Sequence, residues 1–128
     1  MNVLTRLEAP LSLNDAERML LESVRRLAGE VLAPAAMDYD RKGEFPWANV
    51  RALNELGLNA MFIPDSYGGA ELSFRAYLAC VYEISRACAS TGIIWATNFH
   101  AMKPLIAYGN EEQKARLLPR IADGGLAS

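Results

Sequence analysis

The feature that most constrains the fold is the stretch from Ala87 to Met102, which contains no Asp, Glu, Lys or Arg. Ser90, Thr97 and Asn98 dilute its apolar character, and it is shorter than the roughly 20 apolar residues that span a bilayer. A helix without charges must be covered by protein or border an apolar cavity. We therefore expect a helix buried inside protein, with no membrane partner.

Capping patterns predict where the other helices begin. Asn14 followed by Glu17, and Asn110 followed by Gln113, each match the capping-box pattern. Ser73 can cap the helix that runs to about Ala87. The expected inward faces are Leu20, Val24, Leu27 and Val31; Trp47, Val50 and Leu53; Phe74, Tyr77, Leu78, Val81 and Ile84; and Leu117, Leu118 and Ile121.

Proline and glycine predict where helices end. Pro34 should start a separate second helix, Pro46 lies near the first position of the third, and Gly57 should cap its end. Pro104 is expected to end or kink the uncharged helix. The helical period disappears over 58–72, and alternating strand patterns are absent from the sequence. We predict an all-α helical bundle of about six helices, forming one domain over 1–128.

Composition excludes several classes of function. The chain is 52% hydrophobic and 22% charged, with a formal net charge of −2, which does not provide the basic surface that nucleic acid requires. The first ten residues lack the apolar core of a signal peptide. Cys80 and Cys88 lie about 12 Å apart along a helix, too far for a disulfide. Reduced thiols indicate a cytoplasmic protein.

The sequence contains no complete set of catalytic residues. His100 is the only histidine, so neither a nucleophile–base pair nor a zinc site can be assembled around it. Glu83 lies beside an apolar position, where an ion pair with Arg86 is favoured over catalysis. Gly68 and Gly69 lack the flanking pattern of a phosphate-binding loop. We expect neither catalytic residues nor a metal site in this chain.

One face of the uncharged helix is a candidate ligand wall. Ile93, Ala96, Thr97 and His100 follow the i, i+3, i+4, i+7 spacing and so share a side. A small, slightly polar and uncharged face is typical of a ligand channel. Close helix packing through small residues is the alternative, and the pattern taken alone favours it.

The order of several short motifs resembles the opening of the acyl-CoA dehydrogenase family. Together they cover nearly the whole chain, from 13 to 125. They are Leu13-Asn14-Asp15-Ala16-Glu17-Arg18, Ala33-Pro34-Ala35, Gly43-Glu44-Phe45-Pro46, Glu55-Leu56-Gly57-Leu58, Ile63-Pro64-Asp65-Ser66-Tyr67-Gly68-Gly69, Tyr82-Glu83-Ile84-Ser85-Arg86, Tyr108-Gly109-Asn110-Glu111-Glu112-Gln113-Lys114, Leu118-Pro119 and Gly124-Gly125.

The resemblance implies a larger enzyme of fatty acid metabolism. A glutamate base beyond Ser128 removes the α-proton of an acyl-CoA thioester, FAD accepts the β-hydride, and an electron-transferring flavoprotein takes the electrons. The family's β-domain and C-terminal helical domain are expected outside 1–128, and the whole protein is expected to be a homodimer or homotetramer. The chain alone should then bind no flavin, turn over no substrate, and expose apolar surface that promotes self-association.

Within this family the uncharged helix borders the acyl chain, which implies substrate contacts at Ile93, Ala96, Thr97 and His100, with Trp95 as a packing residue. His100 departs from the usual aliphatic residue, which favours a branched, aromatic or hydroxylated acyl group over a straight chain, unless the histidine only bonds a backbone carbonyl. A flavin monooxygenase or oxidase of the same fold, and a helical interaction module without enzymatic activity, are the alternatives.

Overall fold

The computed structural model describes residues 12–125, and these residues form helices and turns without a strand among them. The all-α prediction is confirmed. A π-helical turn over Ala28–Leu32 joins the first two helices, and short 3-10 turns occupy Leu58–Ala60 and Asp65–Tyr67. The α-helices are α2 (Asp15–Leu27), α3 (Ala33–Lys42), α4 (Trp47–Glu55), α5 (Phe74–Ala87), α6 (Ala89–Tyr108) and α7 (Glu111–Ala122).

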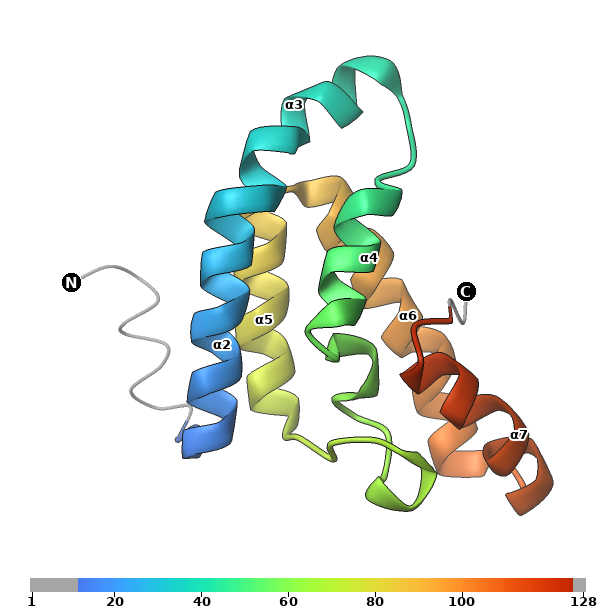
Figure 1. The fold of residues 1–128 in the computed structure, drawn as a ribbon. Coiled ribbons are helices and arrows are strands. Elements are labelled where there is room, and N and C mark those ends of the chain that lie inside the picture. The colour runs from blue at the N-terminus through green and yellow to red at the C-terminus, as the bar shows by residue number, and fades with distance from the viewer. Residues whose placement is uncertain (1–11, 126–128) are drawn as a thin grey trace.

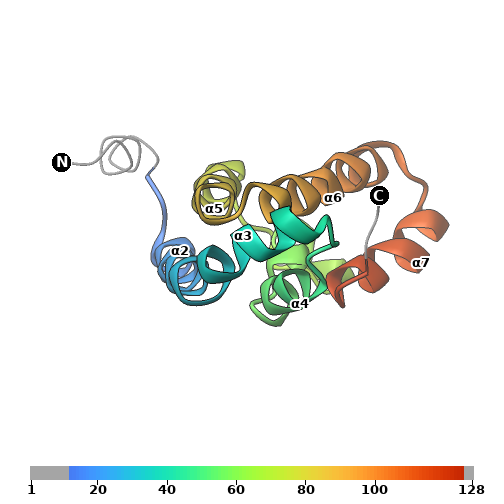
Figure 2. The same ribbon diagram turned by 90° about the horizontal axis from the view of Figure 1, so that it is seen from above.

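The helices form two layers with α3 across one end. Seen from above, α5 and α6 make one layer, while α2, α4 and α7 make the other (Figure 2). Helices α2 and α5 lie side by side and run in the same direction (Figure 1). Helix α6 contacts α5, α4 and α7. The helix expected to be buried is covered on one side only, because the inner face of α6 is buried while Ile93 on its other side is 63% exposed.

The predicted caps are all present. Asn14 and Glu17 form a full capping box at the start of α2, and Asn110 and Gln113 form another at α7. The Ser73 hydroxyl accepts the N–H of Ala76 at 3.2 Å. Each side chain satisfies a backbone N–H that the first helical turn leaves without a partner.

Pro34 begins a second helix, as expected, but no break separates this helix from the first. The chain passes from α2 into α3 through the π-helical turn, and Pro34 occupies the first turn of α3. The wider turn adds a residue, so that Leu32 is fully buried while Val31, expected inward, is 39% exposed. Pro104 likewise lies inside α6, which continues to Tyr108.

Besides Val31, three of the expected inward residues are exposed. Phe74 and Leu78 of α5 are 53% and 46% exposed, because α2 and α6 cover α5 on other sides and leave this edge uncovered. Trp47 is 54% exposed and packs on Phe45, with ring centroids 4.4 Å apart. Periodicity identifies an apolar stripe but not which part of it a neighbour covers.

The segment 58–72, expected to be irregular, supplies core residues between the two layers. Leu58, Met61 and Ile63 are at most 1% exposed. Gly69 lies directly against Ile63, since a Cβ on this glycine would be 1.7 Å from the Ile63 carbonyl oxygen. Gly69 therefore allows a close backbone crossing, which a larger residue would prevent.

Candidate functional site

Helix α6 presents two different faces. Its inner face buries Thr91, Gly92, Trp95, Asn98 and Met102. Its outer face carries the predicted residues: Ile93 is 63% exposed, Ala96 and Thr97 are half-buried, and His100 is exposed. The outer face of α6 is therefore as apolar as a buried face but is not covered by the rest of the domain. Such a face is free to contact another molecule or segment.

A groove follows the contact between α5 and α6. It has a volume of about 520 Å³ and is bounded by Val81, Ser85, Ala89, Ser90, Gly92, Ile93 and Ala96, none of which carries a charge. Gly92 makes this contact possible, because a Cβ there would lie 2.2 Å from the Ser85 hydroxyl oxygen and 2.8 Å from the Ser85 Cα. The groove can bind an apolar group and offers only serine hydroxyls to a polar one.

The structure brings only part of the predicted face into this groove. Ile93 and Ala96 line it, whereas Thr97 and His100 lie further along α6 and outside the lining. The Thr97 hydroxyl donates to the Ile94 carbonyl at 2.9 Å, so its hydrogen is already used within the helix. Trp95 is 6% exposed and packs against Tyr77, as expected for a packing residue.

A second, larger groove lies between α6 and α7, on residues that sequence reasoning did not select. It has a volume of about 710 Å³ and is lined by Ala101, Leu105, Leu117, Arg120, Ile121, Asp123 and Gly125. Leu117 was expected to face inward but is only half-buried. The sequence pattern indicated Leu117 and Ile121 only as core positions of the last helix and gave no sign of a groove between them and Leu105.

Buried polar groups fix the inner face of α6. The Asn49 amide donates to the Thr91 hydroxyl at 2.9 Å, and Thr91 donates to the Cys88 sulfur at 3.1 Å. All three residues are at most 3% exposed. This chain of hydrogen bonds ties α4 to the start of α6, and nothing in the sequence pattern indicated it.

Glu83 forms the structural ion pair that was predicted, with an additional partner. Its carboxylate lies 3.0 Å from Arg86 and 2.6 Å from Arg25 of α2, and its side chain is 1% exposed. The two guanidinium groups satisfy the buried charge. Burial and the charge of Glu83 raise the pKa of Cys80 to about 12, which makes this thiol a poor nucleophile.

The described residues bear on the expectations for metal sites, membrane spans and disulfides. Among residues 12–125, no group of three or more His, Cys, Asp or Glu is placed to hold a metal ion. Across the same residues, no helix meets the length and hydropathy that a membrane span requires. Cys80 and Cys88 are buried and free, as predicted; the inferred cytoplasmic location stays a prediction.

Neither the glycine pair at 68–69 nor the groove between α5 and α6 is built to hold the phosphates of a dinucleotide. Of the glycine pair at 68–69, Gly69 packs tightly against the Ile63 backbone, while Gly68 has a positive φ of 83°. The groove between α5 and α6 lacks a cationic side chain. This part of the chain therefore does not fit a complete FAD site, and no step through FAD can be derived from it.

The fold defines an all-α domain in which α5 and α6 border an open groove without charged side chains. Residues 14–125 match the family model of the acyl-CoA dehydrogenase N-terminal domain. The chain belongs to the acyl-CoA dehydrogenase family and carries its N-terminal domain. The sequence resemblance is thereby confirmed.

Curated relatives extend this assignment. The short-chain specific acyl-CoA dehydrogenase of Sus scrofa is 37% identical over 115 residues, which cover 89% of this chain and 28% of that protein. The 3-sulfinopropanoyl-CoA desulfinase of Paraburkholderia xenovorans is 40% identical over 103 residues, covering 80% of this chain and 26% of the relative. The chain thus spans little more than a quarter of the length of these relatives.

Solved structures share the arrangement of helices. A chain from work on the electron transferring flavoprotein of Acidaminococcus fermentans superposes with a TM-score of 0.81 and 28% identity, over 88% of this chain and 30% of that one. Butyryl-CoA dehydrogenase from Megasphaera elsdenii gives the same TM-score and coverage at 23% identity, which supports the fold alone.

Proposed function

We propose that this chain is part of a flavin-dependent α,β-dehydrogenase of acyl-CoA thioesters, in which the α5–α6 groove forms an apolar wall of the acyl pocket. The observation that carries the proposal is the uncharged groove on α6, with Ile93 and Ala96 at its edge, in a chain of this family. Bound FAD would accept the β-hydride. Its binding residues and the base lie outside the residues described.

The part played by these residues is to bind and to exclude water. An apolar acyl chain gains free energy from contact with Ile93 and Ala96, and a dry wall strengthens electrostatic interactions at the reacting atoms. Thr97 and His100 continue this side of α6. We place them near the distal end of the acyl group, where His100 favours a branched, aromatic or hydroxylated substituent.

The names of the relatives agree on an acyl-CoA thioester as substrate but differ in the reaction. One is named as a dehydrogenase and another as a desulfinase of an acyl-CoA, at similar identity to this chain. We therefore infer that this domain contributes to recognition of the acyl group. The choice among dehydrogenation, desulfination and oxygen-dependent oxidation would then depend on other parts of the protein.

The test uses the whole protein that carries this chain, with a filled groove. In Ala96→Leu the larger side chain should enter the groove and raise KM for longer or branched acyl-CoA substrates about tenfold or more, with a smaller effect on short ones. Ala107→Leu is the matched control, since Ala107 is exposed on α6 and lines neither groove. An unchanged substrate profile for Ala96→Leu would remove the α5–α6 groove from the acyl pocket.

The reaction type is tested by reduction of the flavin. We expect an acyl-CoA substrate to bleach the flavin absorbance anaerobically and an electron-transferring flavoprotein to reoxidise it. Rapid reoxidation by oxygen would instead favour an oxidase or monooxygenase. The full-length protein should form a homodimer or homotetramer, whereas the present chain alone should show neither flavin absorbance nor turnover.

A further inference from the structure

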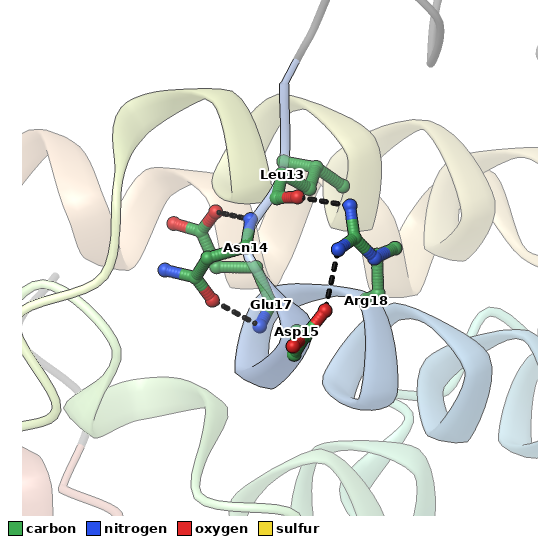
Figure 3. Close-up of polar contacts among 5 residues, drawn as sticks. All are labelled: Leu13, Asn14, Asp15, Glu17 and Arg18. Atoms are coloured by element: carbon green, nitrogen blue, oxygen red, sulfur yellow. Dashed lines mark hydrogen bonds and ion pairs between the residues drawn. The ribbon is translucent and has the colours of Figure 1, made fainter.

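One buried carboxylate lies at the start of two helices. Glu17 is only 4% exposed. Its Oε2 accepts the backbone N–H of Asn14 at 3.0 Å, as Figure 3 shows. Its Oε1 accepts the backbone N–H of Ser73 at 2.9 Å. Asn14 and Ser73 are the N-caps of α2 and α5, so a single side chain joins both caps.

The direction of the helices explains why a carboxylate is needed at this point. Helices α2 and α5 run parallel (Figure 1), so the positive ends of their dipoles lie together. Two like ends repel, and an anion between them reduces the repulsion. At the opposite ends Arg25 and Arg86 surround Glu83. The helix pair is thus held by one charged contact near each end.

The contact to Ser73 also holds the segment that precedes α5. Within that segment, the N–H of Leu72 donates to the Met61 carbonyl at 2.6 Å, and the N–H of Ala70 donates to the Ala60 carbonyl at 2.9 Å. These bonds make 60–72 one connected unit. The bond between Ser73 and Glu17 then ties the end of this unit to α2.

The charges around Glu17 favour its ionised form. Burial alone would raise the pKa of Glu17, but the hydrogen bonds from Ser73 and Asn14, with the charge of Arg75, outweigh it and hold the pKa below its ordinary value. Cys80, also on α5, faces the carboxylate as a neutral thiol. On α2, Asp15 pairs with Arg18 at 2.5 Å (Figure 3), and Arg18 also donates to the Leu13 carbonyl.

We propose that Glu17 is an acid-sensitive clasp, whose carboxylate holds the start of α5 and the segment 60–72 against α2 and whose protonation releases them. The sign follows from the lowered folded-state pKa: the stabilisation is fully present above the unfolded-state pKa of glutamate and is lost as the pH falls through the lower, folded-state value. Since α5 carries Val81 and Ser85, release would also loosen one wall of the α5–α6 groove.

Amide NMR of the 128-residue chain between pH 7 and pH 3 tests the clasp. The amide protons of Ser73 and Asn14 should move upfield together, with one shared midpoint below the ordinary pKa of glutamate. Exchange protection at Ser73, corrected for the intrinsic rate, should fall about tenfold across the same range, as expected for loss of a hydrogen bond to a charged acceptor. A shared midpoint is expected because the one Glu17 carboxylate accepts both N–H groups.

Variants separate Glu17 from the other carboxylates. In Glu17→Gln the two amides should no longer titrate, whereas Glu22→Gln, at an exposed position on the same helix, should leave both titrations intact. A flat Ser73 shift in the unmodified chain would overturn the proposal, and so would an unchanged titration in Glu17→Gln. If the Gln variant does not fold, the Ser73 titration in the unmodified chain is sufficient to test the proposal.

Discussion

At the scale of single residues, Gly92 sets how closely α5 and α6 approach. An alanine Cβ at this position would lie 2.8 Å from the Ser85 Cα, an atom that cannot move without shifting α5. The groove between the two helices depends on this spacing, because Ser85 and Gly92 both line it. The absence of a side chain at 92 therefore determines the shape of the candidate site.

We predict that Gly92→Ala lowers the free energy of unfolding by about 1–3 kcal/mol, the usual cost of overpacking. The matched control is Gly29→Ala, where the added Cβ meets nothing within 4 Å and the gain in helix propensity should stabilise the protein by about 0.5–1 kcal/mol. Urea unfolding followed by circular dichroism measures both. Equal effects of the two substitutions would show that the Ser85 contact is not tight.

Cys80 offers a second prediction at this scale. Burial and the nearby charge of Glu83 raise the pKa of its thiol to about 12, and Cys88 is also buried. At pH 8 we expect neither thiol of the native chain to react with a thiol-specific chromogenic reagent within minutes, and both to react in denaturing urea. Fast native labelling of Cys80, identified by peptide mass, would contradict the burial described.

At the scale of elements, helix α7 is held by polar contacts at both ends and by apolar packing in its second half. Asn110 and Gln113 form the capping box, and the hydroxyl of Tyr67 donates to Glu111 at 2.6 Å. At its other end, Asn54 and Asn59 donate to the Gly124 and Gly125 carbonyls. The apolar contribution of α7 comes from Leu118 and Ile121, which pack in a smaller cluster with Ile63 and Met102.

Removal of the α7 N-cap should therefore destabilise α7 without destabilising the other helices. Asn110→Ala is expected to cost about 1 kcal/mol and to increase hydrogen exchange in the first turn of α7, while exchange in α2 stays unchanged. Asn110→Asp is the control, because aspartate caps equally well and should leave exchange near the original rate. An Ala variant that destabilises α2 and α7 equally would mean that the domain opens only as a whole.

At the scale of the whole molecule, the α5–α6 layer is covered on one side only. The other helices pack against its inner side (Figure 2), and Phe74, Leu78 and Ile93 remain 46% to 63% exposed on α5 and α6. Exposed apolar groups of this size favour association. This face coincides with the proposed acyl wall, which links the domain's solution behaviour to its function.

We expect the isolated chain to associate in a concentration-dependent way through this face. Leu78→Glu should shift sedimentation-equilibrium data toward the monomer, because a charge cannot be buried there without a partner. Met37→Glu is the control, since Met37 is also exposed, at 58%, but lies on α3, away from the layer. A clean monomer at high concentration, or equal effects of the two substitutions, would contradict this expectation.

Local signals in the sequence determined where helices begin, which class of fold forms and which family the chain belongs to. Asn14 with Glu17, Ser73, and Asn110 with Gln113 act within one turn of their own helix, so the residues carry this information without any knowledge of neighbours. The lack of charge over 87–102 predicted that this helix would be covered by protein, and the structure covers it on one face only.

Only the tertiary structure decided which part of each apolar stripe is covered. Phe74 and Leu78 belong to the periodic face of α5, yet they are exposed because α2 and α6 approach α5 from other sides. The joining of Glu17 to Ser73, the pairing of Glu83 with Arg25, and the approach of Gly92 to Ser85 bring together helices whose relative positions are not encoded in local spacing. The groove and the clasp result from packing, and packing depends on all helices at once.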